Sequence, residues 1–200
     1  MFGPERFALR PDRGEVFAWL QCGEALPCRA AFEAEWGAAT AALRESMLPC
    51  AAVWREGALM TVFVTLGAAA EERITALFRE EAYVRGSLLN TMCDEMLFQM
   101  DEQMAALLQE MLAGEGLYIE KRLEPQVDLS PAELIGRFAP LRSALPFARV
   151  SEAGTLSPTK SMMYCLTLSG HRCEQHALHD CARCRQKDCL YRDPKTRPAE

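Results

Sequence analysis

Histidine, long apolar runs and the common catalytic signatures are scarce or missing in this chain of 200 residues. No stretch approaches the run of about 18 apolar residues that a membrane-spanning helix needs, so we expect no membrane association. The start of the chain, MFGPERFALRPDRGE, lacks the apolar core of a signal peptide. Together these absences predict a cytoplasmic protein.

Motifs that would identify a known chemistry are missing as well. We find no G-x-G-x-x-G fingerprint, no P-loop, no G-x-S-x-G elbow and no H-E-x-x-H metal motif. The formal net charge of −6 at pH 7 argues against general nucleic-acid binding, which requires a basic surface. No complete catalytic site is visible, so the sequence leaves open whether the chain is an enzyme.

Cysteine is plentiful, with nine residues, and the odd number argues against a fully disulfide-paired secreted framework. Thiols of a cytoplasmic protein are normally reduced or bound to metal. Five of the nine sit among apolar neighbours, and we expect these to be buried, unreactive thiols: Cys22, Cys28, Cys50, Cys93 and Cys165.

The other four cysteines and all three histidines fall within nineteen residues, from His171 to Cys189. Thiolate and imidazole are strong ligands for zinc and iron, and a Cys-x2-Cys pair places two sulfurs on one turn. Four sulfurs are the number used by structural zinc sites and by cubane iron–sulfur clusters. We therefore predict a metal site in the C-terminal tail, residues 171–200, formed by Cys173, Cys181, Cys184 and Cys189.

The residues alone leave the identity of the metal open. The intervals between the four cysteines, x7, x2 and x4, match neither the separated pairs of common zinc fingers nor the ferredoxin run. An iron–sulfur cluster is the first interpretation, a zinc ion the second, and free thiols in an unstructured tail the third. His176 or His179 could also replace Cys173 as the fourth ligand.

The hydrophobic pattern predicts an α+β fold, with helices packed around a small antiparallel sheet. Apolar residues at spacings of three and four predict helices over residues 14–20, 30–48 and 71–111. Apolar and β-branched runs predict strands over residues 58–66, 117–119, 147–151 and 161–168. These elements form a domain over residues 1–170, and the metal-binding tail follows it.

Local signals refine the helices. The long pattern over 71–111 should break near Arg85-Gly86 and stop at Gly114 and Gly116. The sequence Ser130-Pro131-Ala-Glu133 is a capping box with proline in the first helical position, so it predicts the start of a further helix.

Two sets of side chains lie on the predicted long helix. Methionines from Met92 to Met111 recur at helical spacing, and we expect them to pack in the core. Docking of a flexible partner or a flat cofactor is the other interpretation of this stripe. The carboxylates of Glu80-Glu81 and Asp94-Glu95 are expected on solvated helix faces.

Three segments carry, by their order and spacing, a resemblance to a known family. They are residues 65–95 (TLGAAAEERITALFREEAYVRGSLLNTMCDE), residues 156–163 (LSPTKSMM) and residues 181–192 (CARCRQKDCLYR). Over residues 15–192 the chain resembles the reactivation domain of vitamin B12-dependent methionine synthase, which binds S-adenosylmethionine. The likeness is closer to small stand-alone relatives of that methionine synthase activation domain, which end in a similar cysteine tail.

The resemblance implies a C-shaped α+β domain that binds S-adenosylmethionine and faces a cobalamin-carrying domain. In the family, an Arg-Pro-x-x-Gly-Tyr segment holds the methionine carboxylate through its arginine. The corresponding segment here, Arg122-Leu-Glu-Pro125-Gln-Val, keeps the arginine but lacks the Gly-Tyr pair. We expect Arg122 at the mouth of the main cleft, and we expect Arg122, Glu120, Lys160 and Ser161 to bind the cofactor.

The function implied is that of an accessory protein for the reductive reactivation of a cobalamin (corrinoid) methyltransferase. Such a protein helps to convert oxidised Co(II) back to the methylated cofactor. A separate cobalamin-carrying protein or methyltransferase is the expected partner, because the chain has no Asp-x-His-x-x-Gly motif for binding cobalamin. An iron–sulfur cluster in the tail could relay the electron, since such clusters reach potentials as low as about −700 mV.

Two other functions stay open at this point. One is a metal-stabilised module of the same fold that binds a ligand or a protein and has no S-adenosylmethionine chemistry. The other is a complete enzyme that uses S-adenosylmethionine, for which the sequence shows no acid–base machinery.

The metal-site prediction can be tested by substitution. Replacing Cys181 and Cys184 by Ser should abolish metal binding, because a four-sulfur site loses half of its ligands, whereas Cys93→Ser should leave the metal content intact. Metal analysis after anaerobic purification checks this, and absorbance at about 400 nm distinguishes an iron–sulfur cluster from zinc. Unchanged metal content in the double variant would contradict the prediction.

Overall fold

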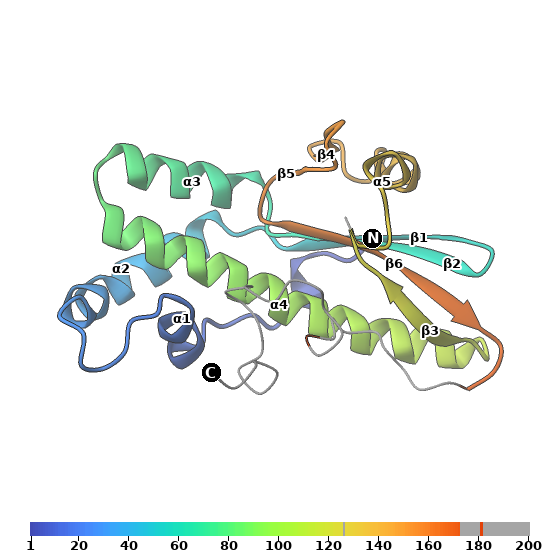
Figure 1. The fold of residues 1–200 in the computed structure, drawn as a ribbon, viewed down its shortest axis with the longest axis horizontal. Coiled ribbons are helices and arrows are strands. Elements are labelled where there is room, and N and C mark those ends of the chain that lie inside the picture. The colour runs from blue at the N-terminus through green and yellow to red at the C-terminus, as the bar shows by residue number, and fades with distance from the viewer. Residues whose placement is uncertain (126, 173–180, 182–200) are drawn as a thin grey trace.

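Four strands form one antiparallel sheet, in the order β1-β2-β6-β3 (Figure 1). The computed structural model describes residues 1–125, 127–172 and 181. The elements along the chain are α1 (Arg13–Trp19), α2 (Arg29–Ser46), β1 (Cys50–Glu56), β2 (Leu59–Thr65), α3 (Ala68–Arg79), α4 (Tyr83–Gly114), β3 (Tyr118–Leu123), α5 (Pro131–Phe138), β4 (Arg149–Val150), β5 (Leu156–Ser157) and β6 (Ser161–Ser169), with short 3₁₀ helices at Pro4–Arg6 and Ala139–Leu141. The predicted α+β class with a small antiparallel sheet is confirmed.

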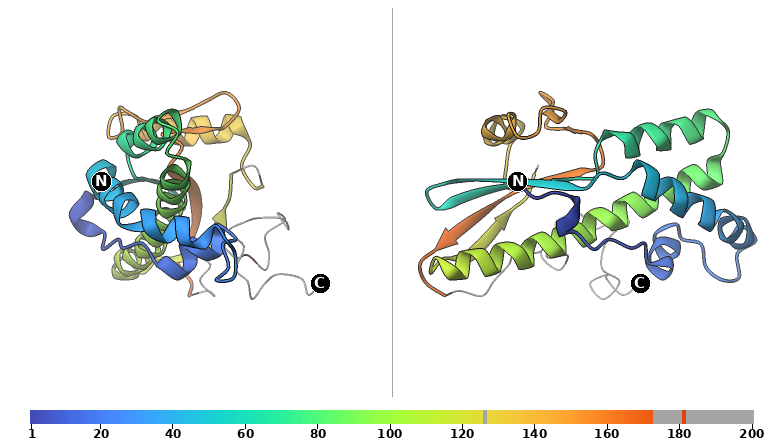
Figure 2. Two further views of the ribbon diagram at one scale, coloured as in Figure 1. Left: turned by 90° about the vertical axis from the view of Figure 1, so that its left-hand side faces the viewer. Right: turned by 180° about the vertical axis from the view of Figure 1, so that it is seen from behind.

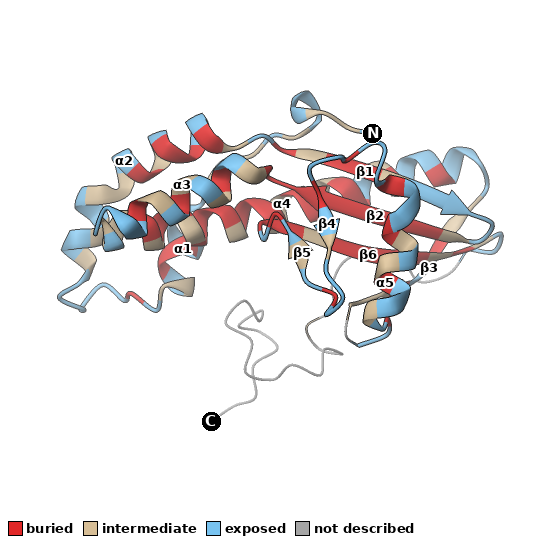
Figure 3. Cartoon of the chain, turned by 90° about the horizontal axis from the view of Figure 1, so that it is seen from above, coloured by how far each residue is buried: buried red, intermediate tan, exposed pale blue. Residues whose placement is uncertain are grey.

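Both faces of the sheet are covered. The sequence of β2 is an uninterrupted apolar run because its side chains are buried on both faces. Helix α4 lies along one face, and α5 with the paired strands β4 and β5 lies over the other (Figure 1; Figure 3). Val62 and Val64 belong to the core on the α4 side and Phe63 to the core on the α5 side, because successive strand side chains alternate.

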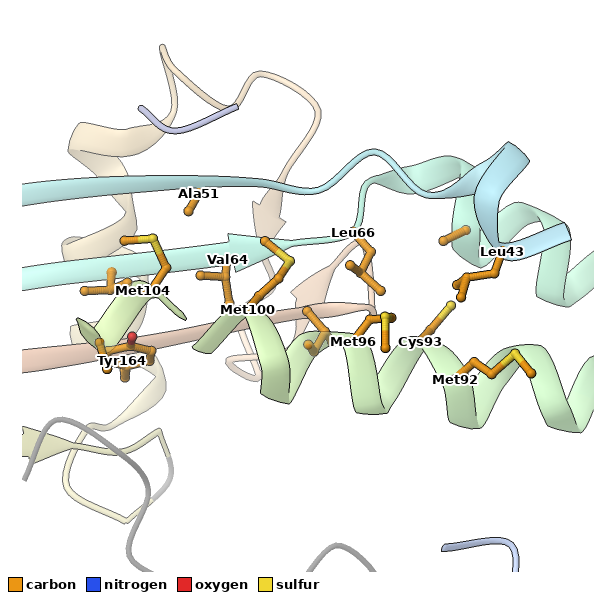
Figure 4. Close-up of a cluster of buried hydrophobic side chains, with 14 of the residues drawn as sticks. Leu43, Ala51, Val64, Leu66, Met92, Cys93, Met96, Met100, Met104 and Tyr164 are labelled. Carbon is orange, nitrogen blue, oxygen red and sulfur yellow. The ribbon is translucent and has the colours of Figure 1, made fainter. Parts of the chain in front are cut away.

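A stripe of methionines buries one face of α4. Met92, Met96, Met100 and Met104 recur every four residues and are fully buried (Figure 4). The prediction of core packing is confirmed for these four and is wrong for Met111, which is exposed near the end of the helix. Although α4 has 32 residues, no helix in the described part of the chain combines the length and hydropathy needed to cross a bilayer.

The long helical region breaks at residues 80–82, so the predicted break at Arg85-Gly86 is wrong. Glu81 has a φ of 60°, in the left-handed region, and this residue turns the chain from α3 into α4. Gly86 lies within the first turn of α4, where a Cβ would stand 3.3 Å from the ring of Phe78. The glycine therefore permits the close approach of α3 to α4 rather than a break.

Four strands differ from the predictions, and one of them, the two-residue β5, was expected to be part of a loop. β1 was missed, because it begins with small residues and ends in exposed polar ones, and it is held by pairing along its whole length with β2. β3 continues beyond the predicted 117–119 to Leu123, through residues that are too polar to resemble a buried strand. The predicted strand 147–151 is reduced to the two residues of β4, whereas β6 matches its prediction.

Helix α5 begins as its local sequence predicts. The Ser130 hydroxyl accepts a hydrogen bond from the backbone N–H of Glu133 at 3.3 Å, and the Glu133 carboxylate accepts one from the N–H of Ser130 at 2.8 Å. Pro131 occupies the first turn, where its missing N–H costs nothing. The capping box is therefore complete.

The N-terminal segment 8–12 runs beside α4 (Figure 2) and is held there by side chains of that helix. Four residues of α-helix rise about 6.0 Å and two residues of extended chain advance about 6.7 Å, so the two repeats match. Hydrogen bonds of 2.7 to 3.3 Å link alternate backbone residues to side chains four apart, namely Ala8 with Gln103, Arg10 with Gln99, and Asp12 with Glu95.

Two carboxylates predicted to face solvent do not. Glu95 is buried under the N-terminal segment, and Asp94 is half-buried against the chain that leads into β6, whereas Glu80 and Glu81 are exposed as predicted. Burial raises the pKa of Glu95 to about 7, and hydrogen bonds from Gln99 and the Asp12 N–H only partly oppose this. Both carboxylates are covered by segments distant in the sequence, so helical spacing could not reveal their burial.

The expectation of five buried, unreactive thiols is wrong at two positions. Cys22, Cys93 and Cys165 are buried, but Cys28 is exposed and Cys50 is half-buried. Cys28 stands at the end of the loop between α1 and α2, and Cys50 opens β1, which is an edge strand. Loop and edge positions leave side chains accessible even when their sequence neighbours are apolar.

Substitution Glu95→Gln should stabilise the protein at alkaline pH and change little at acidic pH. The folded pKa of about 7 lies above the ordinary 4.5, so the stability gained from the bound proton is complete below pH 4.5 and is lost as the pH rises through 7. This difference in pKa corresponds to at most about 3 kcal/mol. Urea unfolding at acidic and alkaline pH measures the effect.

The matched control is Glu102→Gln, which removes an exposed carboxylate from the same helix. Its free energy of unfolding should stay within about 0.5 kcal/mol of wild type at both pH values. A difference between Glu95→Gln and wild type that is the same at both pH values would show that Glu95 does not titrate in this range.

Candidate functional site

The four predicted cofactor-binding residues lie at two places on the sheet. Glu120 and Arg122 belong to β3, while Lys160 immediately precedes β6 and Ser161 is its first residue. Cofactor binding by these residues stays a prediction. The contacts of each side chain within the protein determine whether it is available to bind a ligand.

Arg122 is the centre of a buried group of side chains that we call the Arg122 cluster, together with Asp101, Glu124 and Tyr164. Its Nη1 donates a hydrogen bond of 2.6 Å to Asp101 Oδ2, and its Nε lies 2.7 Å from Glu124 Oε1. The guanidinium carbon stands 3.6 Å from the centre of the Tyr164 ring. The side chains of Arg122 and Asp101 are only 6% and 5% exposed.

The sheet register brings the cluster together. Arg122 stands opposite Leu166 of β6, and Tyr164, two residues earlier, is its diagonal neighbour on the same face. That face is covered by α4, from which Asp101 approaches the sheet. Each of the three residues comes from a different element, so the cluster exists only in the folded chain.

The Arg122 cluster has two carboxylates, Asp101 and Glu124, facing one cation. Burial lowers the pKa of the Arg122 guanidinium, but the charges of Asp101 and Glu124 outweigh burial and raise the pKa above its ordinary value. Burial, followed by the charge of Asp101, raises the pKa of Tyr164 well above its usual value. The cluster therefore holds a permanently charged arginine beside a neutral phenol.

Two polar atoms of the cluster keep hydrogen-bonding capacity. Asp101 Oδ1 and the Tyr164 hydroxyl are buried without an aligned hydrogen-bond partner among the described residues, although their groups are close enough to interact electrostatically. The guanidinium of Arg122, in contrast, already faces two carboxylates of the protein. In this arrangement Arg122 does not fit the role of holding the carboxylate of S-adenosylmethionine, because that carboxylate would have to displace Asp101 or Glu124.

Lys160 and Ser161 form a second cluster, the Lys160 junction, with Thr65 and Asp94. The Lys160 ammonium donates to Asp94 Oδ1 at 2.5 Å, and the Ser161 hydroxyl donates to Thr65 Oγ1 at 2.8 Å. The Thr65 hydroxyl in turn donates to the Lys160 carbonyl at 3.3 Å and accepts from the N–H of Gly67 at 3.1 Å. Lys160 and Ser161 are thus bound within the protein.

Helix α4 supplies one carboxylate to each cluster. Asp94 and Asp101 are seven residues apart, so they lie on one face of the helix, two turns or about 10 Å apart. One receives Lys160 from the start of β6 and the other receives Arg122 from β3. These two ion pairs connect the helix to the sheet at separate points.

The four predicted cofactor-binding residues do not all contact one another in the structure. Glu120 is exposed on β3, at a shift in register between Ile119 and Lys121, and does not join Arg122. Arg122 is buried rather than at the mouth of a cleft, so that expectation is wrong. A cavity of 280 Å³ lies elsewhere, under α5, lined by Phe138, Arg142, Leu145, Pro146, Ala148, Arg149 and Val150.

The predicted metal ligands cannot be placed as a set. Cys173, Cys184 and Cys189 lie outside the described residues, and Cys181 is half-buried. Within residues 1–125, 127–172 and 181, no three His, Cys, Asp or Glu side chains gather in a way that could hold a metal ion. The metal site in the tail stays a prediction.

Sequence reasoning missed the partners of Arg122 and Lys160. Asp101 lies within the methionine stripe, and an acidic residue in an otherwise apolar stripe signals a buried partner. Tyr164 interrupts the apolar run of β6 in the same way. The signal for Glu124 is weaker, because it lies beyond β3 in a charged stretch.

Comparison with known proteins adds no family to this description. No protein-family model matches the chain, and no curated protein matches it. The resemblance to the methionine synthase activation domain therefore rests on the residues quoted above.

Substitution Asp101→Ala should lower the free energy of unfolding by about 3 kcal/mol, because it leaves the buried Arg122 with one carboxylate fewer. Glu115→Ala is the matched control, since it breaks the exposed pair with Arg55 and should cost at most about 1 kcal/mol. Urea unfolding of the two variants measures both effects. Equal losses would mean that the Arg122 cluster contributes no more than a surface ion pair.

Proposed function

We propose that this protein is an accessory protein for the reductive reactivation of a cobalamin (corrinoid) methyltransferase, similar to the methionine synthase activation domain. The observation that carries the proposal is the contact between two of the segments on which the resemblance rests. Residues 65–95 and 156–163 are far apart in the sequence, yet they meet through the Lys160 junction and through a 2.9 Å hydrogen bond from the Thr159 N–H to Glu71 Oε2.

The proposed role is to assist a partner rather than to complete a reaction alone. A cobalamin-carrying protein or methyltransferase supplies the corrinoid, in the cytoplasm. The four tail cysteines would hold an iron–sulfur cluster, which would supply the electron needed at cobalt, or alternatively a zinc ion, which would only stabilise the chain. S-adenosylmethionine supplies the methyl group in this scheme, and it reaches Arg122 only if Asp101 or Glu124 moves away.

A second function is supported by the closure of the Arg122 cluster. An arginine that is 6% exposed and paired with two internal carboxylates acts as a structural residue. That observation favours a metal-stabilised module of the same fold, which binds a protein or ligand and has no S-adenosylmethionine chemistry. Both functions involve binding to a partner. Only the first uses S-adenosylmethionine as a methyl donor.

The distribution of charge along the chain indicates which part of it contacts a partner. The tail from residue 171 has a formal charge of +2 and the rest of the chain −8. An acidic partner would be attracted to the tail and repelled by the body. We therefore propose that the tail forms the contact with the cobalamin-carrying protein.

The test is a pull-down of a cobalamin-carrying protein from the same organism, with the full chain and with a chain ending at residue 172. The full chain should retain the partner at low salt and lose it above about 0.3 M salt, where the Debye length is well below 10 Å. The shortened chain should retain none. The variant Cys181→Ser with Cys184→Ser keeps the charge of the tail and separates the effect of charge from that of metal.

Retention of the partner by the shortened chain would refute the tail as the contact, and no retention by the full chain at low salt would refute the partner role. Calorimetry with S-adenosylmethionine then distinguishes the two functions. Binding that weakens at least tenfold, about 1.4 kcal/mol, in Arg122→Ala supports reactivation chemistry. A wild-type protein that releases no heat at millimolar ligand supports the module without a methyl donor.

A further inference from the structure

Two cysteines in the loop between α1 and α2 stand in contact. The Sγ atoms of Cys22 and Cys28 are 3.3 Å apart, with the five residues Gly-Glu-Ala-Leu-Pro between them in the chain. A disulfide bond joins sulfurs about 2.0 Å apart, so a shift of little more than 1 Å would connect them. Both are thiols in this structure.

The backbone around the two thiols is held in place. The N–H of Cys22 donates to the Phe17 carbonyl at 3.0 Å, which ties the loop to α1. At the other end, Arg29 Nη1 donates to the Cys22 carbonyl at 3.1 Å while the guanidinium covers the Phe17 ring at 3.8 Å. These bonds keep Cys22 and Cys28 facing each other.

The two thiols differ in accessibility, which sets the order of any reaction. Cys28 is exposed, whereas Cys22 is 2% exposed and burial raises its pKa, as does its hydrogen bond with Cys28. A soluble reagent therefore meets Cys28 first. Cys22 is shielded from solvent but is in reach of the sulfur of Cys28.

We propose that Cys22 and Cys28 form a reversible intramolecular disulfide on reaction with a low-molecular-weight disulfide such as oxidised glutathione. The Cys28 thiolate attacks one sulfur of the reagent, the sulfur–sulfur bond breaks, and one glutathione leaves as a thiol after taking up a proton. The Cys22 sulfur then loses its proton, attacks Cys28 Sγ and expels the second glutathione. Two protein thiols are oxidised, and one disulfide is reduced to two thiols.

The bond would close the loop between α1 and α2, from three residues after the end of α1 to the residue that precedes α2. α1 packs on α2 through the ring stack of Phe17 and Trp36, whose centres are 5.7 Å apart, and on α4 through Trp19 and Phe98 at 5.3 Å. The redox state of the pair therefore controls how freely α1 can separate from the helices that it contacts. This inference is independent of the proposed function.

The test is to incubate the full chain with millimolar oxidised glutathione and then to alkylate the free thiols in denaturant. The protein is digested with trypsin, and the peptide masses are measured by mass spectrometry. Cleavage after Arg13 and Arg29 yields one peptide, residues 14–29, that contains both cysteines. It should carry no alkyl group and no glutathione and be two hydrogens lighter than the dithiol form. Dithiothreitol should restore two alkylatable thiols. Peptide 45–55, with the half-buried Cys50, is the internal control and should stay alkylated.

Two variants test the order of the steps. Cys22→Ser should leave a lasting glutathione adduct on Cys28, because the sulfur that expels glutathione is gone. Cys28→Ser should leave Cys22 as an alkylatable thiol, because Cys22 is shielded. A wild-type peptide that keeps both thiols, holds a persistent glutathione adduct, or links Cys28 to another cysteine would overturn the proposal.

Discussion

Burial of the apolar face of α4 is the constraint on which the other elements depend. The helix is about 48 Å long, and its methionine stripe is covered by the sheet and by the other helices. Each fully buried methionine contributes about 1.5–3 kcal/mol, whereas a buried ion pair contributes close to nothing net after desolvation. Packing therefore supplies the stability, and the pairs of Asp94 and Asp101 fix where the helix lies along the sheet.

The same ion pairs restrict what the predicted site can do. Arg122 and Lys160 are the cations that a ligand carboxylate or phosphate would need, and each is already neutralised by a carboxylate of α4. A binding function at these residues would require the pairs to open, which exposes buried charge. The proposed contact between the tail and a partner does not depend on Arg122 or Lys160.

For the cysteines, spacing in the sequence and the polarity of neighbouring residues predict different things. The tail cysteines attract attention by their spacing, which is visible in the sequence. Cys22 and Cys28 have no such signature, and apolar neighbours made them resemble core thiols. Their contact depends on a turn after α1 that brings two loop residues together, and on Arg29, which fastens that turn.

Local patterns were sufficient for the elements whose signals lie within a few residues. The capping box of α5, the apolar run of β2 and the methionine period of α4 are all of this kind, and the α+β class follows from them. The pairing of strands and the burial of side chains under distant segments were not predictable, because both depend on residues far apart in the chain. β1 is a strand because β2 pairs with it, Glu95 is buried because residues 8–12 cover it, and Gly86 is required because Phe78 approaches it. The Arg122 cluster belongs to this second group: three elements must first pack before its charges can meet.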